Sequence, residues 1–120
     1  MVNVLLVDDA AYMRKLIQMM LQKDGHEVVG EARSGIEGVE KYKELKPDLV
    51  IMDVTMPDMG GIDALIQIRE YDKDAKILMC TASDQSSHRD AANNAGAVGY
   101  LVKPIKREDI LAKVAELCPK

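Results

Sequence analysis

The stretch that decides the fold is Asp48–Gly61, which reads D-L-V-I-M-D-V-T-M-P-D-M-G-G. Its apolar run, Leu49–Met52, lies just after a proline and ends at Asp53. A run this short and rich in valine and isoleucine predicts a strand buried on both faces, as in a parallel sheet. Asp53 is therefore expected at the carboxyl end of a central strand, where α/β proteins bind ligands. Taken alone, Asp53 is better explained as a cap of the following turn.

Apolar runs and amphipathic segments alternate along the rest of the chain. The other expected strands are Val2–Val7, Glu27–Ala32, Ala75–Cys80 and Val98–Val102. The expected helices are a segment ending at Gly25, a segment from Ser34 to about Lys46, Ile62–Tyr71, about Gln85–Ala95, and a last one with Glu108 and Asp109 in its first turn. Five strand–helix units in a row predict an α/β fold with a five-stranded parallel sheet and helices on both faces.

Local patterns describe each helix further. The apolar positions are Met13, Leu16, Ile17, Met20 and Leu21 in the first helix, Ile62, Leu65, Ile66 and Ile68 in the third, and Ile110, Leu111, Val114 and Leu117 in the last. Ser34 and Glu37 have the spacing of a capping box, and Gly38, which is costly in a helix, indicates a close packing contact. The fourth helix should bury mostly alanines, namely Ala91, Ala92 and Ala95, and should be the most weakly anchored helix.

Composition limits the possible functions. A chain of 120 residues, 48% apolar and 30% charged, is expected to form one globular domain. No stretch is long and apolar enough to span a membrane and no signal peptide is visible, so a cytoplasmic location is expected. The net charge of −4 argues against nucleic-acid binding. Cys80 and Cys118 lack a metal-binding pattern, which predicts two free thiols in a reducing compartment.

Polar side chains able to do chemistry follow four of the five strands. They are Asp8 and Asp9 after the first, Asp53 at the third, Thr81 at the fourth and Lys103 at the fifth. The carboxyl ends of parallel strands lie at one edge of the sheet, so these side chains should converge. Three carboxylates repel one another and one lysine cannot neutralise them, a combination that suits Mg²⁺. Such a site can bind a phosphoryl group, to which Thr81 could donate a hydrogen bond and Lys103 a charge.

Each of these residues also has an ordinary structural explanation. Asp8 and Asp9 could cap a helix, which is about an even choice when they are considered alone. Thr81 could cap the fourth helix, Lys103 could be a solvated charge, and Tyr100 could be a half-buried strand residue. Their joint occurrence at four strand ends, in this order, favours the functional interpretation.

The combined motifs resemble the receiver domain of bacterial two-component response regulators. They are L-L-V-D-D, D-L-V-I-M-D-V-T-M-P-D-M-G-G, C-T-A and G-Y-L-V-K-P, and the resemblance covers the whole chain. It implies a single receiver domain over residues 1–120 with the flavodoxin-like (βα)5 fold and the strand order 2-1-3-4-5. It also implies a phosphorylation-activated switch that catalyses only its own phosphorylation and dephosphorylation.

The resemblance assigns a role to each residue of the site. It implies that Asp53 is the phosphoacceptor, and that Asp9, Asp53 and the backbone carbonyl of Thr55 bind Mg²⁺ directly. Asp8 would act through a metal-bound water. Thr81 and Lys103 would contact the phosphoryl group, and the bond between Lys103 and Pro104 would be cis.

Within the family, D-D-A-A-Y-M-R and Tyr100 are similar to stand-alone chemotaxis regulators. This implies a monomer that receives its phosphoryl group from a sensor histidine kinase and signals by protein–protein contact, with Thr81 and Tyr100 as switch residues. The expected target is a flagellar motor switch, or else another output protein, and a phosphatase is a further possible partner. The alternative is a receiver of another two-component or phosphorelay pathway. The resemblance also implies that Thr55 and Ser83 occupy positions that vary within the family and tune the lifetime of the phosphate.

Three other interpretations fit less well. A haloacid-dehalogenase-type phosphatase would need an acid where Thr55 stands, and a flavodoxin-like electron carrier would need a neutral loop in place of Asp8 and Asp9. Phosphodonor histidines of this signalling type belong to helical bundles, so His26 and His88 are expected to be surface residues.

Overall fold

The structure is a computed structural model that describes residues 1–56, 58–82 and 86–119, without the side chains of residues 86–88. Its strands are β1 (Asn3–Val7), β2 (Glu27–Ala32), β3 (Leu49–Asp53), β4 (Ile77–Thr81) and β5 (Gly99–Val102). Its helices are α1 (Ala11–Lys23), α2 (Gly35–Leu45), α3 (Gly61–Tyr71), α4 (Ser86–Asn94) and α5 (Arg107–Leu117). The alternation predicted from the sequence is therefore confirmed. The predicted start of the fourth helix, Gln85, lies outside the described residues.

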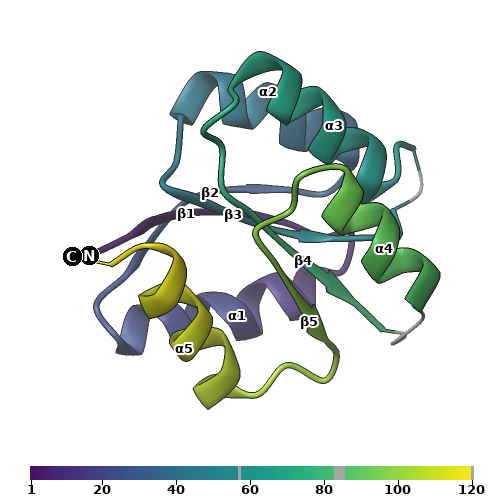
Figure 1. Cartoon of the computed structure of the whole chain (residues 1–120). Coiled ribbons are helices and arrows are strands. Elements are labelled where there is room, and N and C mark those ends of the chain that lie inside the picture. Colours follow the sequence, from purple (N-terminus) through teal and green to yellow (C-terminus); the bar gives the residue numbers. More distant parts are fainter. Residues whose placement is uncertain (57, 83–85, 120) are drawn as a thin grey trace.

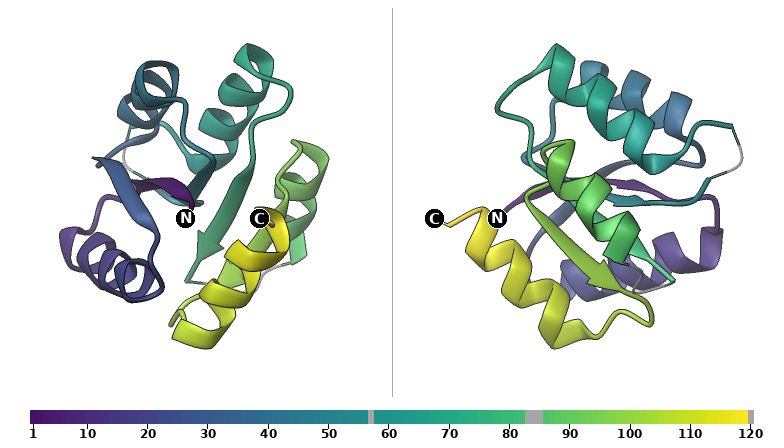
Figure 2. Two further views of the ribbon diagram at one scale, coloured as in Figure 1. Left: turned by 90° about the vertical axis from the view of Figure 1, so that its left-hand side faces the viewer. Right: turned by 45° about the vertical axis from the view of Figure 1, so that its right-hand side comes forward.

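The five strands form one parallel sheet in the order β2-β1-β3-β4-β5. Helices cover both faces, with α1 and α5 on one side and α2, α3 and α4 on the other (Figure 1). The same layers are seen in the two further views of Figure 2. Both the predicted strand order and the doubly covered sheet are confirmed. This arrangement brings the carboxyl ends of all five strands to one edge.

Two hydrophobic clusters, one on each side of the sheet, fill the space beneath the helices. Alternate residues of β1 belong to different clusters, because successive side chains of a strand point to opposite faces. Leu5 packs on the side of α2, and Leu6 packs on the side of α1. The chain has no phenylalanine or tryptophan, and methionines such as Met52 and Met79 are completely buried in their place.

The predicted end of the first helix at Gly25, the Ser34 cap of the second and the close contact at Gly38 are confirmed. Gly25 follows α1 with a φ of +82°, a conformation that glycine adopts without strain. Ser34 caps α2 by accepting a hydrogen bond from the Glu37 amide at 3.2 Å. A Cβ atom at Gly38 would lie 3.0 Å from Val7 Cγ1, so a glycine lets α2 pack directly on β1.

Several individual burial predictions were wrong. Leu16 and Ile66 are exposed, because each lies beside the narrow stripe that its helix turns toward the sheet. Ala91 is also exposed, whereas Ala92 is completely buried and Ala95 half-buried. The described part of α4 thus buries little apolar surface, which agrees with weak anchoring, although its stability stays a prediction.

His26 is not a surface residue as predicted. Its Nδ1 atom accepts a hydrogen bond from the Val2 amide at 3.1 Å, and its side chain is 9% exposed. His26 Nε2 contacts Asp24 at 3.1 Å, so the imidazole ties the start of β1 to the turn after α1. The side chain of His88 lies outside the described residues. No helix in the described part of the chain has the length and hydrophobicity needed to cross a bilayer.

Candidate functional site: a carboxylate cluster at the sheet edge

The carboxylates of Asp8, Asp9 and Asp53 meet at the carboxyl edge of the sheet. One oxygen from each can be chosen so that all three lie within 4.8 Å of one another. Asp8 and Asp53 are buried, whereas Asp9 is exposed. The expected convergence of β1 and β3 is therefore observed, and the cluster opens to solvent on the side of Asp9.

Lys103 reaches this cluster from the end of β5. Its Nζ atom lies 2.9 Å from Asp8 Oδ2 and 3.6 Å from Asp53 Oδ2, and its side chain is only 16% exposed. The Lys103 amide also donates to the carbonyl of Thr81 at 2.7 Å, which fixes the end of β5 against the end of β4. Lys103 is thus a partly buried counterion of the cluster. It is not a solvated surface charge, which was its simpler structural explanation.

Burial and charge act in opposite directions on the two partners. Burial raises the pKa of the Asp53 carboxyl above its usual value, and the Lys103 charge offsets only part of this effect. Burial alone would lower the pKa of the Lys103 ammonium, but the hydrogen bond to Asp8 and the charges of Asp53 and Asp8 raise it overall. The lysine is therefore held charged beside a carboxyl whose negative form is poorly solvated.

Backbone contacts hold Asp8 in place. Its amide donates to the Ala32 carbonyl at 3.0 Å, and its Oδ1 atom accepts from the Ala10 amide at 2.9 Å. The N-cap of α1 is Ala10, which has no side-chain capping bond. The simpler explanation, in which Asp8 or Asp9 is the N-cap of α1, is therefore wrong. The other oxygen of Asp8, Oδ2, faces Lys103.

The loop after Asp53 is held by contacts that the sequence did not reveal. A Cβ atom at Gly61 would lie 2.0 Å from the Asp53 carbonyl oxygen, so only glycine lets α3 begin so close to β3. Asp58 accepts hydrogen bonds from the amides of Gly35 at 3.2 Å and Met59 at 2.6 Å, which joins the loop to α2. The G-G pair was visible in the sequence, but its contact with Asp53 depends on tertiary structure.

The remaining predicted site residues lie at the end of β4, on β5 and in the loop after β3. Thr81 is buried as the last residue of β4, and the exposed Thr55 donates its amide to the Asp53 carboxylate. Tyr100 is half-buried beside the core cluster on the α4 side of the sheet, and the guanidinium of Arg89 lies 5.2 Å from the centre of its ring. The bond between Lys103 and Pro104 is cis, as expected. Ser83 lies outside the described residues.

The donor set fits a hard divalent cation. Three carboxylates and one ammonium leave a formal excess of negative charge, and all three carboxylates offer oxygen atoms, the ligands that Mg²⁺ prefers. The exposed position of Asp9 leaves the cluster accessible from solvent. The chemistry and the arrangement of the residues therefore suit a cation that also contacts an anion.

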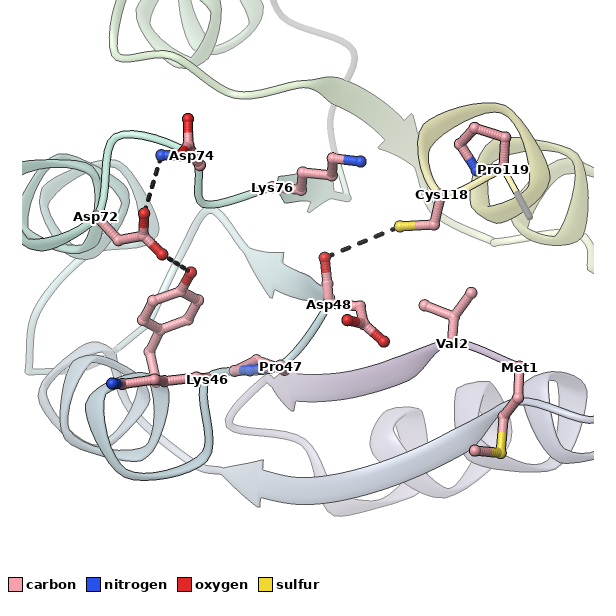
Figure 3. Close-up of a pocket in the computed structure, with 11 residues that line it drawn as sticks. Met1, Val2, Lys46, Pro47, Asp48, Asp72, Asp74, Lys76, Cys118 and Pro119 are labelled. Carbon is pink, nitrogen blue, oxygen red and sulfur yellow. Dashed lines mark hydrogen bonds between the residues drawn. The ribbon is translucent and has the colours of Figure 1, made fainter.

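A cavity of about 450 Å³ lies at the opposite edge of the sheet (Figure 3). Its wall includes Tyr42, which donates to Asp72 Oδ2 at 2.7 Å, and Cys118, whose thiol lies 3.8 Å from the Asp48 carbonyl oxygen. Cys80 and Cys118 are both free thiols, as predicted. Burial raises the pKa of Cys80 to about 12 and also raises the pKa of Cys118, so neither is an activated nucleophile.

Comparison with known proteins identifies the family. Residues 4–115 match the response regulator receiver domain. The chemotaxis protein CheY of Thermotoga maritima is 52% identical over 104 residues, which cover 87% of each chain. CheY of Bacillus subtilis is 50% identical over 112 residues, which cover 93% of each chain. The structure also resembles a crystal structure of the CheX-CheY-BeF3-Mg+2 complex from Borrelia burgdorferi, with a TM-score of 0.94, 34% identity, and coverage of 98% of this chain and 90% of that one.

Proposed function

Because the chain belongs to the response regulator receiver family, we propose that it is a phosphorylation-activated signalling switch whose phosphoacceptor is Asp53. The observation that carries the proposal is the convergence of Asp8, Asp9, Asp53 and Lys103 at one sheet edge. Asp53 ends the central strand β3. Its carboxylate lies in the cluster with the exposed Asp9 and 3.6 Å from the Lys103 ammonium. Residues 1–120 are proposed to act as a single receiver domain.

Each residue of the site has a distinct role in the proposed reaction. Asp9, Asp53 and the Thr55 carbonyl would hold Mg²⁺ directly, and Asp8 would hold it through a water molecule. When bound, the ion would supply positive charge that offsets the charge of the carboxylates and of the phosphoryl oxygens. An oxygen of Asp53 attacks the phosphorus atom, a new O–P bond forms, and the bond to the donor's leaving group breaks.

Lys103 and Thr81 stabilise the transferred group. Lys103 already lies 3.6 Å from Asp53, so its ammonium can pair with a phosphoryl oxygen without a large movement. Thr81, at the end of the neighbouring strand β4, donates its hydroxyl to the same group. Thr55 stands where a phosphatase of the haloacid-dehalogenase type would need an acid. We therefore propose a regulator that catalyses only its own phosphorylation and dephosphorylation.

The proposed switch links Asp53 to the surface around α4. Phosphorylation adds a charge of about −1.5 to −2 and strong acceptor oxygens. The Thr81 hydroxyl then moves toward the phosphoryl group, and Tyr100 turns inward into the space that opens beneath α4. Support comes from the half-buried position of Tyr100 on β5 and from the small apolar surface that the described part of α4 buries.

The proposed output is a protein–protein contact made by a monomer in the cytoplasm. The phosphoryl donor is a sensor histidine kinase, and the target surface includes Arg89, Tyr100 and Lys113 on α4, β5 and α5. The similarity to CheY proteins favours a flagellar motor switch as the target, and the alternative is another two-component or phosphorelay pathway. The CheX-CheY complex supports an additional partner that resembles CheX. No nucleic-acid partner is proposed, in agreement with the net charge of −4.

The first experiment tests the chemistry with a small phosphodonor. The purified chain is incubated with acetyl phosphate, with Mg²⁺ or with EDTA, and its intact mass is measured. We expect one phosphoryl group with Mg²⁺ and none with EDTA. Equal labelling in EDTA would contradict the proposal. Asp9→Ala should need much more Mg²⁺ for the same labelling, because one direct ligand is lost.

The second experiment tests the switch. Nuclear magnetic resonance spectra are compared with and without beryllium fluoride and Mg²⁺, which together imitate the phosphorylated state. We expect the Tyr100 ring to change its rotamer and the Thr81 resonances to shift, and Thr81→Ala should abolish the change at Tyr100. A Tyr100 ring that keeps one rotamer in both states would show that the switch works differently.

A further inference from the structure

Arg14 on α1 connects the acidic end of β1 to the neighbouring strand β2. Its Nη1 atom donates to the backbone carbonyl of Asp8 at 2.6 Å, and its Nε atom donates to Glu31 Oε1 at 2.9 Å. The Arg14 side chain is 11% exposed, whereas the Glu31 side chain is 42% exposed. Arg14 is therefore a nearly buried side chain held by two acceptors, and one of them is the backbone carbonyl of Asp8 in the carboxylate cluster.

The position of the Asp8 carbonyl explains why a side chain is needed. The Asp8 amide is still bonded to β2, through the Ala32 carbonyl at 3.0 Å, but β2 ends at Ala32. In a parallel ladder the next donor to β1 would be the amide of Ser34, and Ser34 lies beyond β2 as the N-cap of α2. The backbone hydrogen bonds between β1 and β2 thus end at the Asp8 amide. Arg14 donates to the Asp8 carbonyl in place of a backbone amide.

We propose that Arg14 is a positioning residue of the Mg²⁺ site, which acts by fixing the peptide group between Asp8 and Asp9. The inference rests on the proposed function, in which Asp9 binds Mg²⁺ directly. Asp9 is exposed, and the loop between β1 and α1 sets the direction of its carboxylate. Residues that orient metal ligands from behind change metal affinity without touching the metal.

Charge and geometry predict opposite results when Arg14 is changed. A positive charge near three carboxylates weakens cation binding, so its loss would strengthen Mg²⁺ binding if charge alone mattered. However, Glu31 lies 2.9 Å from the guanidinium and neutralises much of its charge. The loss of the fixed peptide group should therefore dominate, and Mg²⁺ binding should weaken.

The test is a Mg²⁺ titration followed by the amide resonances of residues 8–10 in the whole chain. We expect Arg14→Gln to raise the dissociation constant about tenfold, which is the usual effect of removing such a support. Arg14→Lys keeps the charge but cannot bridge both acceptors, so it should also weaken binding. Lys15→Gln is the matched control, because it removes a charge from an exposed neighbour and should leave the affinity within about twofold.

Two results would overturn the proposal. They are an Arg14→Gln variant that binds Mg²⁺ as tightly as the unchanged chain or more tightly, and an Arg14→Lys variant of unchanged affinity. Thermal unfolding shows whether each variant is folded, and Arg14→Lys is the milder change. If Mg²⁺ does not shift these amide resonances in the unchanged chain, the proposed function fails. Arg14 is then tested by amide hydrogen exchange without metal. Faster exchange at Asp9 and Ala10 in Arg14→Gln is then expected, and unchanged exchange would overturn the positioning role.

Discussion

The Lys103 ammonium lies 2.9 Å from the Asp8 carboxylate, across a separation of 95 residues in the chain. The contact joins the last strand, β5, to the acidic loop after β1 and places a positive charge among three carboxylates. We therefore expect it to contribute to stability before any cation or phosphoryl group is bound.

We expect Lys103→Met to destabilise the metal-free chain by about 2 kcal/mol, less than for a fully buried pair because the cluster is open to solvent. Added Mg²⁺ should restore part of this loss, since it can neutralise the same carboxylates. The measurement is urea unfolding with and without Mg²⁺. Lys113→Met is the control, because the pair between Lys113 and Glu116 is exposed and should contribute little. Equal stabilities of the two variants would contradict the counterion role of Lys103.

Asp53 should reduce the stability of the metal-free fold. Burial raises its pKa, so the folded chain binds a proton at Asp53 more tightly than the unfolded chain does. The free energy of unfolding therefore falls as pH rises from the ordinary value of 3.8 through the raised pKa. We expect Asp53→Asn to be more stable than the unchanged chain at neutral pH, and the difference to shrink in acid. Urea unfolding across this pH range tests the sign, and an Asp53→Asn variant less stable than the unchanged chain at neutral pH would contradict it.

The bond between Tyr42 and Asp72 predicts the opposite pH dependence. The Tyr42 hydroxyl donates to Asp72 at 2.7 Å, and this bond lowers the pKa of the Asp72 carboxyl. Its contribution to stability is present above the ordinary value of 3.8 and is lost as pH falls through the lowered pKa. Tyr42→Phe should thus be less stable than the unchanged chain at neutral pH and equally stable in strong acid. A stability difference that persists in acid would assign the loss to packing.

The two glycines before α3 form a matched pair of test positions. A Cβ atom at Gly61 would lie 2.0 Å from the Asp53 carbonyl oxygen, whereas at Gly60 the nearest atom is 3.7 Å away. We expect Gly61→Ala to cost about 2 kcal/mol or more and to slow phosphorylation, because the backbone of Asp53 must shift. Gly60→Ala should cost less than about 1 kcal/mol. Thermal unfolding and acetyl phosphate labelling of both variants test this, and similar behaviour of the two would refute the close-contact argument.

The strand ends were predictable because they depend on local patterns and one general rule. The apolar run before Asp53 indicates a buried parallel strand, and such strands bring their carboxyl ends together. This is why Asp8, Asp9 and Lys103 could be assigned to one cluster from the sequence. The role of Gly38 could be anticipated in the same way, because a glycine within a helix needs a packing reason.

The supports behind the cluster could not be predicted, because they depend on exact distances between elements. Arg14 lies on the polar side of an amphipathic helix and looks like an ordinary surface charge until β2 is seen to end beside it. His26 is polar and follows a turn, yet its imidazole accepts a hydrogen bond from the Val2 amide, just before β1. Leu16 and Ile66 show the reverse error, since an apolar residue one position off the buried stripe remains exposed.

Locating the phosphoryl group on the chain tests the central claim most directly. The chain is labelled with acetyl phosphate and Mg²⁺, reduced with borohydride to convert aspartyl phosphate into homoserine, and mapped by peptide mass spectrometry. The account predicts homoserine at position 53, none in the sample with EDTA, and no labelling of Asp53→Asn. Homoserine at Asp8 or Asp9 instead, or undiminished labelling of Asp53→Asn, would contradict the assignment of Asp53 as the phosphoacceptor.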